Sequence, residues 1–211
     1  MIKSFKKQKK IQSGDLVKII ACHATCWLFK PNNYFNSWRK SLGGGPLLIN
    51  LVHNIDFVRY LIGEIDCVQS FESNAVRGGD SEDTAVALLK FQNGSLGTLS
   101  VSDTIISPWS WELTSKENPI YSYNKQTWYW IGGTHASLEL PQSKIWKSVD
   151  KRSWWEPITQ SNYKIGEYKN YPLAQQLNNF LAVIKEKEEP LCSGTVSYTH
   201  LRAHETPEHR V

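Results

Sequence analysis

A three-glycine turn that leads straight into an apolar helical segment is the feature of this sequence that most limits its fold. Gly43–Gly45 let the backbone turn sharply, and Pro46 suits the first helical position, where a missing backbone N–H costs nothing. Gly63 suits the position just after a helix end. The segment between them, residues 46–62, is apolar nearly all round, so it predicts a helix buried inside the protein.

This predicted helix carries polar side chains at a regular spacing. Asn50, His53 and Asp56 are spaced so that they share one helical face. An imidazole titrates near neutral pH, and beside an amide and a carboxylate in a dry setting it suits proton transfer to or from a hydroxyl group. A plainer interpretation is that His53 is a core histidine whose polar atoms are hydrogen-bonded. The spacing by itself leaves both interpretations open.

The remaining pattern predicts an α+β fold built on a large, mainly antiparallel sheet. Asn93-Gly94 separates two alternating segments and is a strong hairpin signal. Residues 172–188 have the period of a helix, whereas residues 148–166 have no clear pattern. The expected strands comprise residues 16–29, 67–76, 84–91, 95–101, 109–114, 127–132, 136–140 and 144–147.

Composition narrows the class of protein. The chain has 211 residues, of which 40% are hydrophobic, and nine tryptophans, so it can bury a real core and is not of a disordered type. The net charge of +4 is modest for a nucleic-acid binder, and the lysines near the start fit one solvated helix face. No apolar run is long enough to cross a membrane, and no signal-peptide core follows the start. We therefore expect a cytoplasmic protein with no nucleic-acid or membrane partner.

The cysteines predict neither a disulfide framework nor a metal centre. Cys22 and Cys26 are spaced so that both thiols face the same side of a strand, with His23 between them. A zinc site needs two further ligands within comparable reach, and the sequence shows none. We expect reduced cysteines that pack in the core and no bound metal.

Several motifs around the helix resemble one enzyme family. Trp38-Arg39 precedes the glycine turn, and Arg59–Ile65 follows the helix through His53 and Asp56. Together these segments resemble the opening of the substrate domain in the Gfo/Idh/MocA family, and the resemblance spans roughly residues 8–194. Further matching segments are Ser73-Asn74, Glu82–Ala85, Phe91–Thr98, Ser102–Thr104, Pro108–Glu112 and Ile131–His135.

The resemblance implies an NAD(P)-dependent oxidoreductase, a dehydrogenase that transfers a hydride from a sugar, a cyclitol or a related polyol. It also implies an open sheet of the dihydrodipicolinate-reductase type, with helices on one face and the other face used to form a homo-oligomer. His53 becomes the catalytic general acid/base. The family usually has an aspartate four residues before this histidine, where this chain has Ile49. The substrate-binding residues implied are Asn50, Lys30, Trp38, Arg39, Trp109 and Glu112.

Other interpretations stay open for parts of this site and for the whole chain. Arg39 also suits a structural ion pair across the glycine turn, and Glu112 also suits a strand edge. The alternative function is a non-catalytic carbohydrate-binding or scaffold β domain, because aromatic rings stack on sugars as well as fill interfaces. The tryptophans expected at exposed positions are Trp128, Trp130, Trp146, Trp154 and Trp155.

The two ends of the sequence carry separate expectations. Residues 1–14 resemble the end of the helix that leads out of the family's cofactor domain, and no strand followed by G-x-G-x-x-G occurs. We expect the Rossmann domain, which would bind most of the NAD or NADP, to be missing, so that these residues alone are inactive. Residues 15–195 are interpreted as a substrate and oligomerisation domain that is truncated at its end. Residues 196–211 resemble translated sequencing-adapter read-through.

Overall fold

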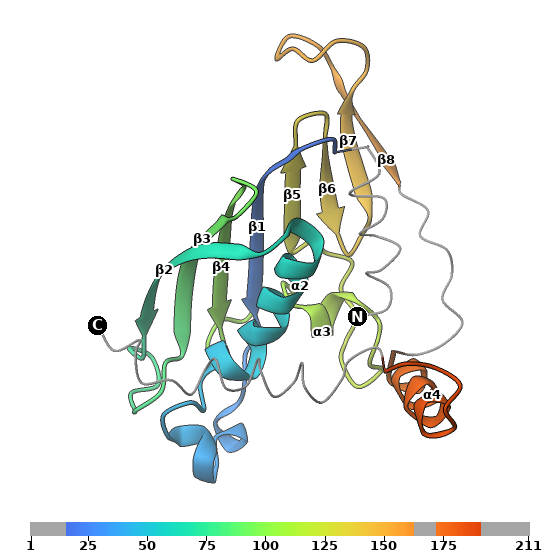
Figure 1. Cartoon of the computed structure of the whole chain (residues 1–211). Coiled ribbons are helices and arrows are strands. Elements are labelled where there is room, and N and C mark those ends of the chain that lie inside the picture. Colours follow the sequence, from blue (N-terminus) through green and yellow to red (C-terminus); the bar gives the residue numbers. More distant parts are fainter. Residues whose placement is uncertain (1–15, 163–171, 191–211) are drawn as a thin grey trace. The chain divides into compact units, whose positions relative to one another are not determined.

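The computed structural model describes residues 16–162 and 172–190 (Figure 1). The chain divides after Glu167 into two compact units, which are described separately. The second unit contains α4 (Pro172–Ile184). The first unit contains β1 (Ile19–Trp27), the 3-10 turns η1 (Asn32–Tyr34) and η2 (Ser37–Lys40), the π-helical turn η3 (Leu47–Leu51), α2 (Val52–Ile62), β2 (Ile65–Ser73), β3 (Thr84–Phe91), β4 (Leu96–Ser102), α3 (Trp111–Thr114), β5 (Tyr129–Gly133), β6 (Ala136–Leu140), β7 (Lys144–Ser148) and β8 (Ile158–Asn162).

The strands of the first unit form one open sheet. Within the described residues the sheet has eight strands in the order β2-β3-β4-β1-β5-β6-β7-β8. β1 pairs with β4 in parallel, and every other neighbouring pair is antiparallel. A parallel pair needs a crossover connection, which the segment with α2 and the β2–β3 hairpin supplies. The predicted α+β class with a mainly antiparallel sheet is therefore confirmed.

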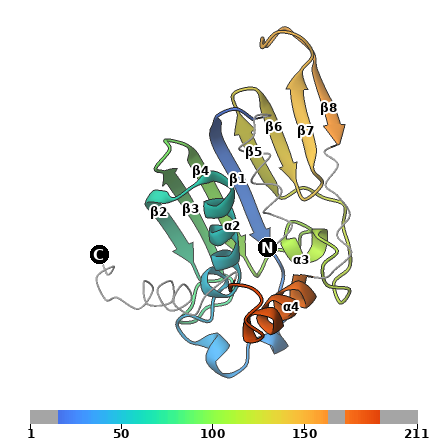
Figure 2. The same cartoon turned by 45° about the vertical axis from the view of Figure 1, so that its right-hand side comes forward.

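The two faces of the sheet differ in burial. Along β3, Ala85, Ala87 and Leu89 are buried, whereas Val86 and Leu88 between them are exposed. Figures 1 and 2 show α2 lying across one face, over β1 and β4. Apolar side chains of the helix segment pack into the core on this face because burial there removes them from water. We call the other side of the sheet the open face.

The open face carries apolar and aromatic side chains beside polar pairs. Leu88 of β3, Leu96 of β4 and Trp130 of β5 are all exposed there. His23 of β1 stacks on Trp130 with ring centroids 5.5 Å apart, and its Nδ1 lies 2.5 Å from Thr98 Oγ1. The predicted division into a covered and an uncovered face thus holds over the middle of the sheet.

The predicted helix is present, but it is buried on one side only. Helical structure runs from Pro46 to Ile62, with Gly63 after its end at φ +136°. Val58 and Leu61 are buried, while Leu48 is exposed. The expectation of burial all round is wrong because the sheet covers one side of the helix and leaves the other open.

One strand assigned from the sequence is wrong, and one strand was not predicted. Residues 109–114 contain the short helix α3 instead of a strand, because Ser110 caps it: Leu113 N–H donates to Ser110 Oγ at 3.4 Å. The unpatterned segment 148–166 contains β8, which pairs with β7 along the far side of the sheet. Pairing with β7 stabilises this strand, whose own sequence has no clear strand pattern.

The exposure expected for the tryptophans is wrong at Trp128 and holds only in part at half-buried Trp146, whereas the prediction for the cysteines is supported. Trp128 is buried, whereas Trp154 and Trp155 are 87% and 82% exposed. Cys22 and Cys26 are unbridged and buried on the covered face, as predicted. Burial raises the pKa of each of these thiols to about 12, so both stay protonated and unreactive at neutral pH.

The second unit confirms a helix in the predicted position. α4 covers residues 172–184 of the expected 172–188. None of the helices in the described ranges is both long enough and apolar enough to span a bilayer. The expected segments 1–14 and 196–211 lie outside the described residues.

Candidate functional site

A polar cluster gathers where β1 ends and the helix segment begins. Lys30 lies just after β1, and its backbone N–H donates to the Asp103 carbonyl at 2.8 Å. The Lys30 residue is only 7% exposed, and its Nζ donates to Asn50 Oδ1 at 2.5 Å. The structure therefore brings together two of the implied substrate-binding residues, from segments far apart in the sequence.

The first two glycines of the turn allow a tight approach to η2. Gly43 has φ +85°, a left-handed conformation that glycine adopts without strain. A Cβ on Gly44 would lie 2.4 Å from the carbonyl oxygen of Arg39. Only a residue without a side chain fits there, so this turn fixes where the following helix starts.

The third glycine lets a carboxylate reach the start of the helix. A Cβ on Gly45 would lie 2.2 Å from the Glu82 carboxylate. Glu82 Oε1 accepts a hydrogen bond from Leu47 N–H at 2.8 Å, which satisfies one of the donors left unpaired in a first helical turn. Asn50 lies in the π-helical turn that follows, a rare geometry that recurs at functional sites.

Asp103 and Arg77 form an ion pair next to this cluster. Asp103 is 1% exposed and lies just beyond β4. Arg77 Nη1 donates to Asp103 Oδ1 at 2.6 Å, and Arg77 Nη2 donates to the Asp103 carbonyl at 3.2 Å. Asp103 Oδ2 lies 4.0 Å from Lys30 Nζ. Sequence reasoning assigned neither residue to the site. The available signal for Asp103 was its position as a charged residue directly after an alternating strand.

The ionisation of Lys30 and Asp103 is coupled through their burial. Burial lowers the pKa of the Lys30 ammonium, and the neighbouring Asp103 carboxylate opposes that shift. Burial raises the pKa of the Asp103 carboxyl, and the hydrogen bond and charge of Arg77 oppose it. Charged groups held together in this way are typical of functional sites.

The structure places His53 and Asp56 differently from the sequence prediction. Both side chains are exposed on α2, so the dry setting expected for the imidazole is absent. The buried polar residue of this helix is Asn54, whose Oδ1 and backbone carbonyl each accept from Tyr129 Oη at 3.1 Å. The core-histidine interpretation is therefore wrong, and His53 is open to a ligand from outside the helix.

Arg39 and Trp38 lie on η2 next to the glycine turn. The Arg39 guanidinium lies 4.4 Å from the Tyr34 ring centroid, and its Nη1 donates to Asn36 Oδ1 at 3.1 Å. In the described part of the chain the Arg39 guanidinium contacts only neutral groups, so the structure does not have the alternative, an ion pair across the turn. Trp38 is 57% exposed, and its ring centroid lies 5.2 Å from the Arg39 guanidinium.

Trp109 and Glu112 lie on the loop and short helix beyond β4. The Trp109 ring meets the Trp27 ring edge to face, with centroids 5.5 Å apart. Glu112 lies in the first turn of α3, and not at a strand edge. Its Oε2 is buried without a hydrogen-bond partner among the described residues, and its charge acts on both Lys30 and Cys26. Glu112 is therefore part of the electrostatic surroundings of Lys30.

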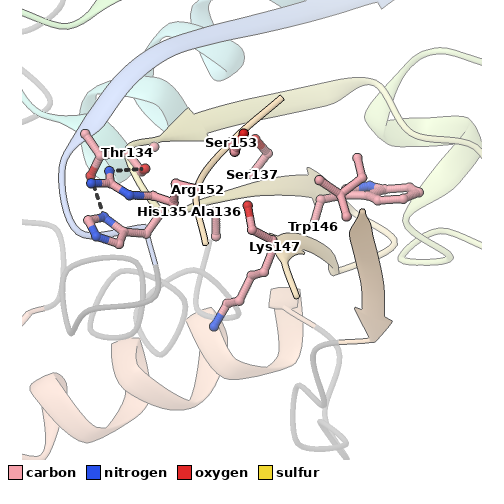
Figure 3. A pocket seen from close by; sticks show the side chains of 11 residues that line it. Thr134, His135, Ala136, Ser137, Trp146, Lys147, Arg152 and Ser153 are labelled. Atoms are coloured by element: carbon pink, nitrogen blue, oxygen red, sulfur yellow. Dashed lines mark hydrogen bonds between the residues drawn. The ribbon is translucent and has the colours of Figure 1, made fainter. Parts of the chain in front are cut away.

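A separate hollow lies near the opposite end of β1, where Ile19 pairs with Gly133. Arg152 Nη1 donates to the Thr134 carbonyl at 2.9 Å, and Thr134 Oγ1 lies 2.9 Å from His135 Nδ1. Figure 3 shows the Lys147 side chain extending below its strand, apart from the Arg152 and His135 side chains. Because Lys30 is buried and in direct contact with Asn50, we place the candidate site there and not at this hollow.

The comparisons with known proteins agree with this fold. The sequence matches the GFO/IDH/MocA C-terminal domain over residues 6–139. The chain belongs to this family. A curated relative, levoglucosan dehydrogenase of Pseudarthrobacter phenanthrenivorans, is 28% identical over 124 residues, which cover 45% of this chain and 32% of the relative.

Solved structures of other proteins have the same fold. An NAD-binding protein from Listeria innocua is 19% identical with a TM-score of 0.65, and the match covers 97% of this chain and 55% of that one. The WlbA dehydrogenase from Bordetella pertussis, in complex with NADH and UDP-GlcNAcA, is 16% identical with a TM-score of 0.64, covering 93% and 54%. This GFO/IDH/MocA chain thus spans about half the length of the solved proteins it matches.

The glycine turn before the helix does not fit the phosphates of the dinucleotide that this family is expected to use. Such phosphates bind free N–H groups at a helix start after a glycine turn. Here the Glu82 carboxylate occupies the start of the helix and accepts from Leu47 N–H. An anion beside Glu82 would be repelled, so the glycine turn of this chain is no phosphate cradle.

Proposed function

We propose that this chain is the substrate-binding domain of an NAD(P)-dependent oxidoreductase that acts on a CH–OH group of a sugar, a cyclitol or a related polyol. The observation that carries the proposal is the hydrogen bond between buried Lys30 and half-buried Asn50 at the start of the helix segment, in a domain of the GFO/IDH/MocA family. The levoglucosan dehydrogenase relative supports a sugar-like substrate. The dinucleotide is bound mainly by a domain outside these residues, and we propose that the enzyme works in the cytoplasm.

The residues at the site have two proposed roles, substrate binding and proton transfer. The nicotinamide, when bound, accepts the hydride from the substrate carbon. Asn50 and Lys30 hold a substrate oxygen by hydrogen bonds, since an amide and an ammonium both donate. His53 takes the proton of the reacting hydroxyl, and its exposure on α2 leaves it accessible to the substrate. Trp38, Arg39, Trp109 and Glu112 complete the proposed surroundings of the substrate.

Replacing the histidine tests this proposal. In the enzyme that carries this domain together with its cofactor-binding domain, His53→Ala should lower kcat by about 100-fold or more, the usual loss for a general acid/base. The KM for the dinucleotide should stay the same. His135→Ala is the matched control, because His135 lies at the hollow near the other end of β1. A folded His53→Ala enzyme with parental kcat would refute the proposed role.

We also propose that the enzyme is a homo-oligomer that associates through the open face. The support is the set of exposed apolar side chains along adjacent strands, a composition typical of contact surfaces. The residues concerned are Phe71, Val86, Leu88, Leu96 and Trp130.

A further inference from the structure

The contact with Lys30 fixes which way the Asn50 amide faces. An ammonium group has only donors, so the atom that it meets at 2.5 Å is the amide oxygen. The amide nitrogen of Asn50 therefore points away from Lys30. Asn50 is half-buried, and its Nδ2 has no hydrogen-bond partner among the described residues, yet it is not shut off from solvent. Two N–H donors are left for a ligand.

The position of Lys30 depends in turn on Asp103. Asp103 Oδ2 is buried without a hydrogen-bond partner in the described part of the chain, and it faces Lys30 Nζ at 4.0 Å. Arg77 fixes the other oxygen of this carboxylate at 2.6 Å and stacks on the Phe35 ring, with 3.6 Å between guanidinium and ring centroid. These contacts restrain the carboxylate, and its free oxygen is directed at Lys30.

We propose that Asp103 is a positioning residue: held by Arg77, it keeps the Lys30 ammonium against Asn50 Oδ1, so that Asn50 offers its N–H donors to the substrate. The proposal rests on the proposed function and adds the chemistry recognised at Asn50, namely an oxygen with a free lone pair on a hydroxyl, carbonyl or carboxylate group. Without its proton, Lys30 would accept a hydrogen bond instead, and the amide would be free to turn over.

Several groups act on the charge of Lys30. The charged groups that act on it are Asp103, Glu112 and Arg77; the Cys26 thiol lies nearby and is neutral at pH 7, and the Tyr34 ring centroid lies 4.9 Å from Nζ. Asp103 is the foremost of the groups whose charge raises the pKa of Lys30 against the lowering by burial. The neutral substitution Asp103→Asn should therefore lower the pKa of Lys30 further. A new carboxylate from Asn50→Asp should raise it.

The first experiment follows the titration of Lys30 directly and needs no activity. The 211-residue chain with isotope-labelled lysines is titrated by NMR, and Lys30→Arg assigns the signal by its loss. The midpoint of Lys30 should move to lower pH in Asp103→Asn and to higher pH in Asn50→Asp. Asp66→Asn is the matched control, since Asp66 pairs with Lys90 at the surface 3.7 Å away, and it should leave the midpoint unchanged. An unmoved midpoint in either test variant would overturn the proposal.

The second experiment measures the consequence for the substrate in the enzyme with its cofactor-binding domain. Asn50→Asp replaces donors by acceptors, so the substrate KM should rise at least tenfold while the dinucleotide KM stays constant. Asp103→Asn should move the alkaline limb of kcat/KM to lower pH. A parental substrate KM in Asn50→Asp would overturn the donor role.

The outcomes separate this proposal from the proposed function. If the proposed function is wrong, the His53→Ala enzyme will keep its full kcat. The midpoints measured in the Lys30 titrations of the chain would not be affected by that result. If circular dichroism shows that Asp103→Asn is unfolded, the Asn50→Asp titration and KM decide, because Asn50 is only half-buried.

Discussion

A single carboxylate on the open face, Glu139, receives donors from three side chains. Trp146 Nε1 donates at 2.7 Å, Thr127 Oγ1 donates at 2.8 Å, and Lys144 Nζ lies 3.4 Å away. Burial alone would raise the pKa of Glu139, but the hydrogen bonds and the charge of Lys144 hold that pKa below its ordinary value. The folded state thus favours the ionised form, and this stabilisation is lost as the pH falls through the folded-state pKa.

Glu139→Gln should therefore destabilise the fold in a pH-dependent way. At pH 7 the free energy of unfolding should be lower than in the parent, and the difference should shrink as the pH falls below the ordinary pKa of 4.5. Urea titrations at a series of pH values measure it. Glu64→Gln, at a surface pair with Arg59, is the control and should change little. A pH-independent difference for Glu139→Gln would contradict the argument.

Only part of the candidate site could be predicted from the sequence. Lys30 and Asn50 were found through a family resemblance, whereas Asp103 and Arg77 join them only after β4 and the β2–β3 connection have folded. The burial expected for His53 was wrong because an apolar helix does not reveal which side its sheet will cover. The burial of His53 and the partners of Lys30 depend on residues that are far apart in the sequence. The local spacing of residues therefore does not predict them.

At the level of elements, the helix start depends on one glycine. Gly45→Ala would place a methyl group against the Glu82 carboxylate, displace it from Leu47 N–H and leave that donor unpaired. The unfolding free energy should fall by about 1–3 kcal/mol, the usual cost of an unsatisfied buried group. Urea denaturation measures the change. Gly132→Ala is the control, because its Cβ would meet only the Ala21 carbonyl at 3.8 Å; equal stabilities of the two variants would refute the explanation.

Elements with local signals were predicted well, and those without were not. Gly94 at φ +84° closes the hairpin between β3 and β4, as the Asn93-Gly94 pair indicates. α3 was missed because its Ser110 cap outweighs the strand preference of the tryptophans around it. β8 was missed because it depends on pairing with β7.

At the level of the whole molecule, the open face predicts the state of association. Leu88→Lys would put a charge among the exposed apolar side chains of β3 and β4, and burying that charge in a contact would be costly. The enzyme should shift from oligomer to monomer, as measured by light scattering after size-exclusion chromatography. Val76→Lys, on the exposed β2–β3 connection, is the control. An unchanged oligomer mass in Leu88→Lys would place the contact elsewhere.

The central place of β1 has a consequence for synthesis of the protein on the ribosome. His23 bonds to Thr98, 75 positions later, and Lys18 bonds to Thr134, 116 positions later. β1 is therefore translated long before either of its neighbours, β4 and β5. Both of its edges stay unpaired until those strands have been translated. Unpaired strand edges pair readily with other chains, and sheets built from distant segments form slowly. A translational pause between β1 and β5 would thus be the moment at which the nascent chain is most prone to aggregate.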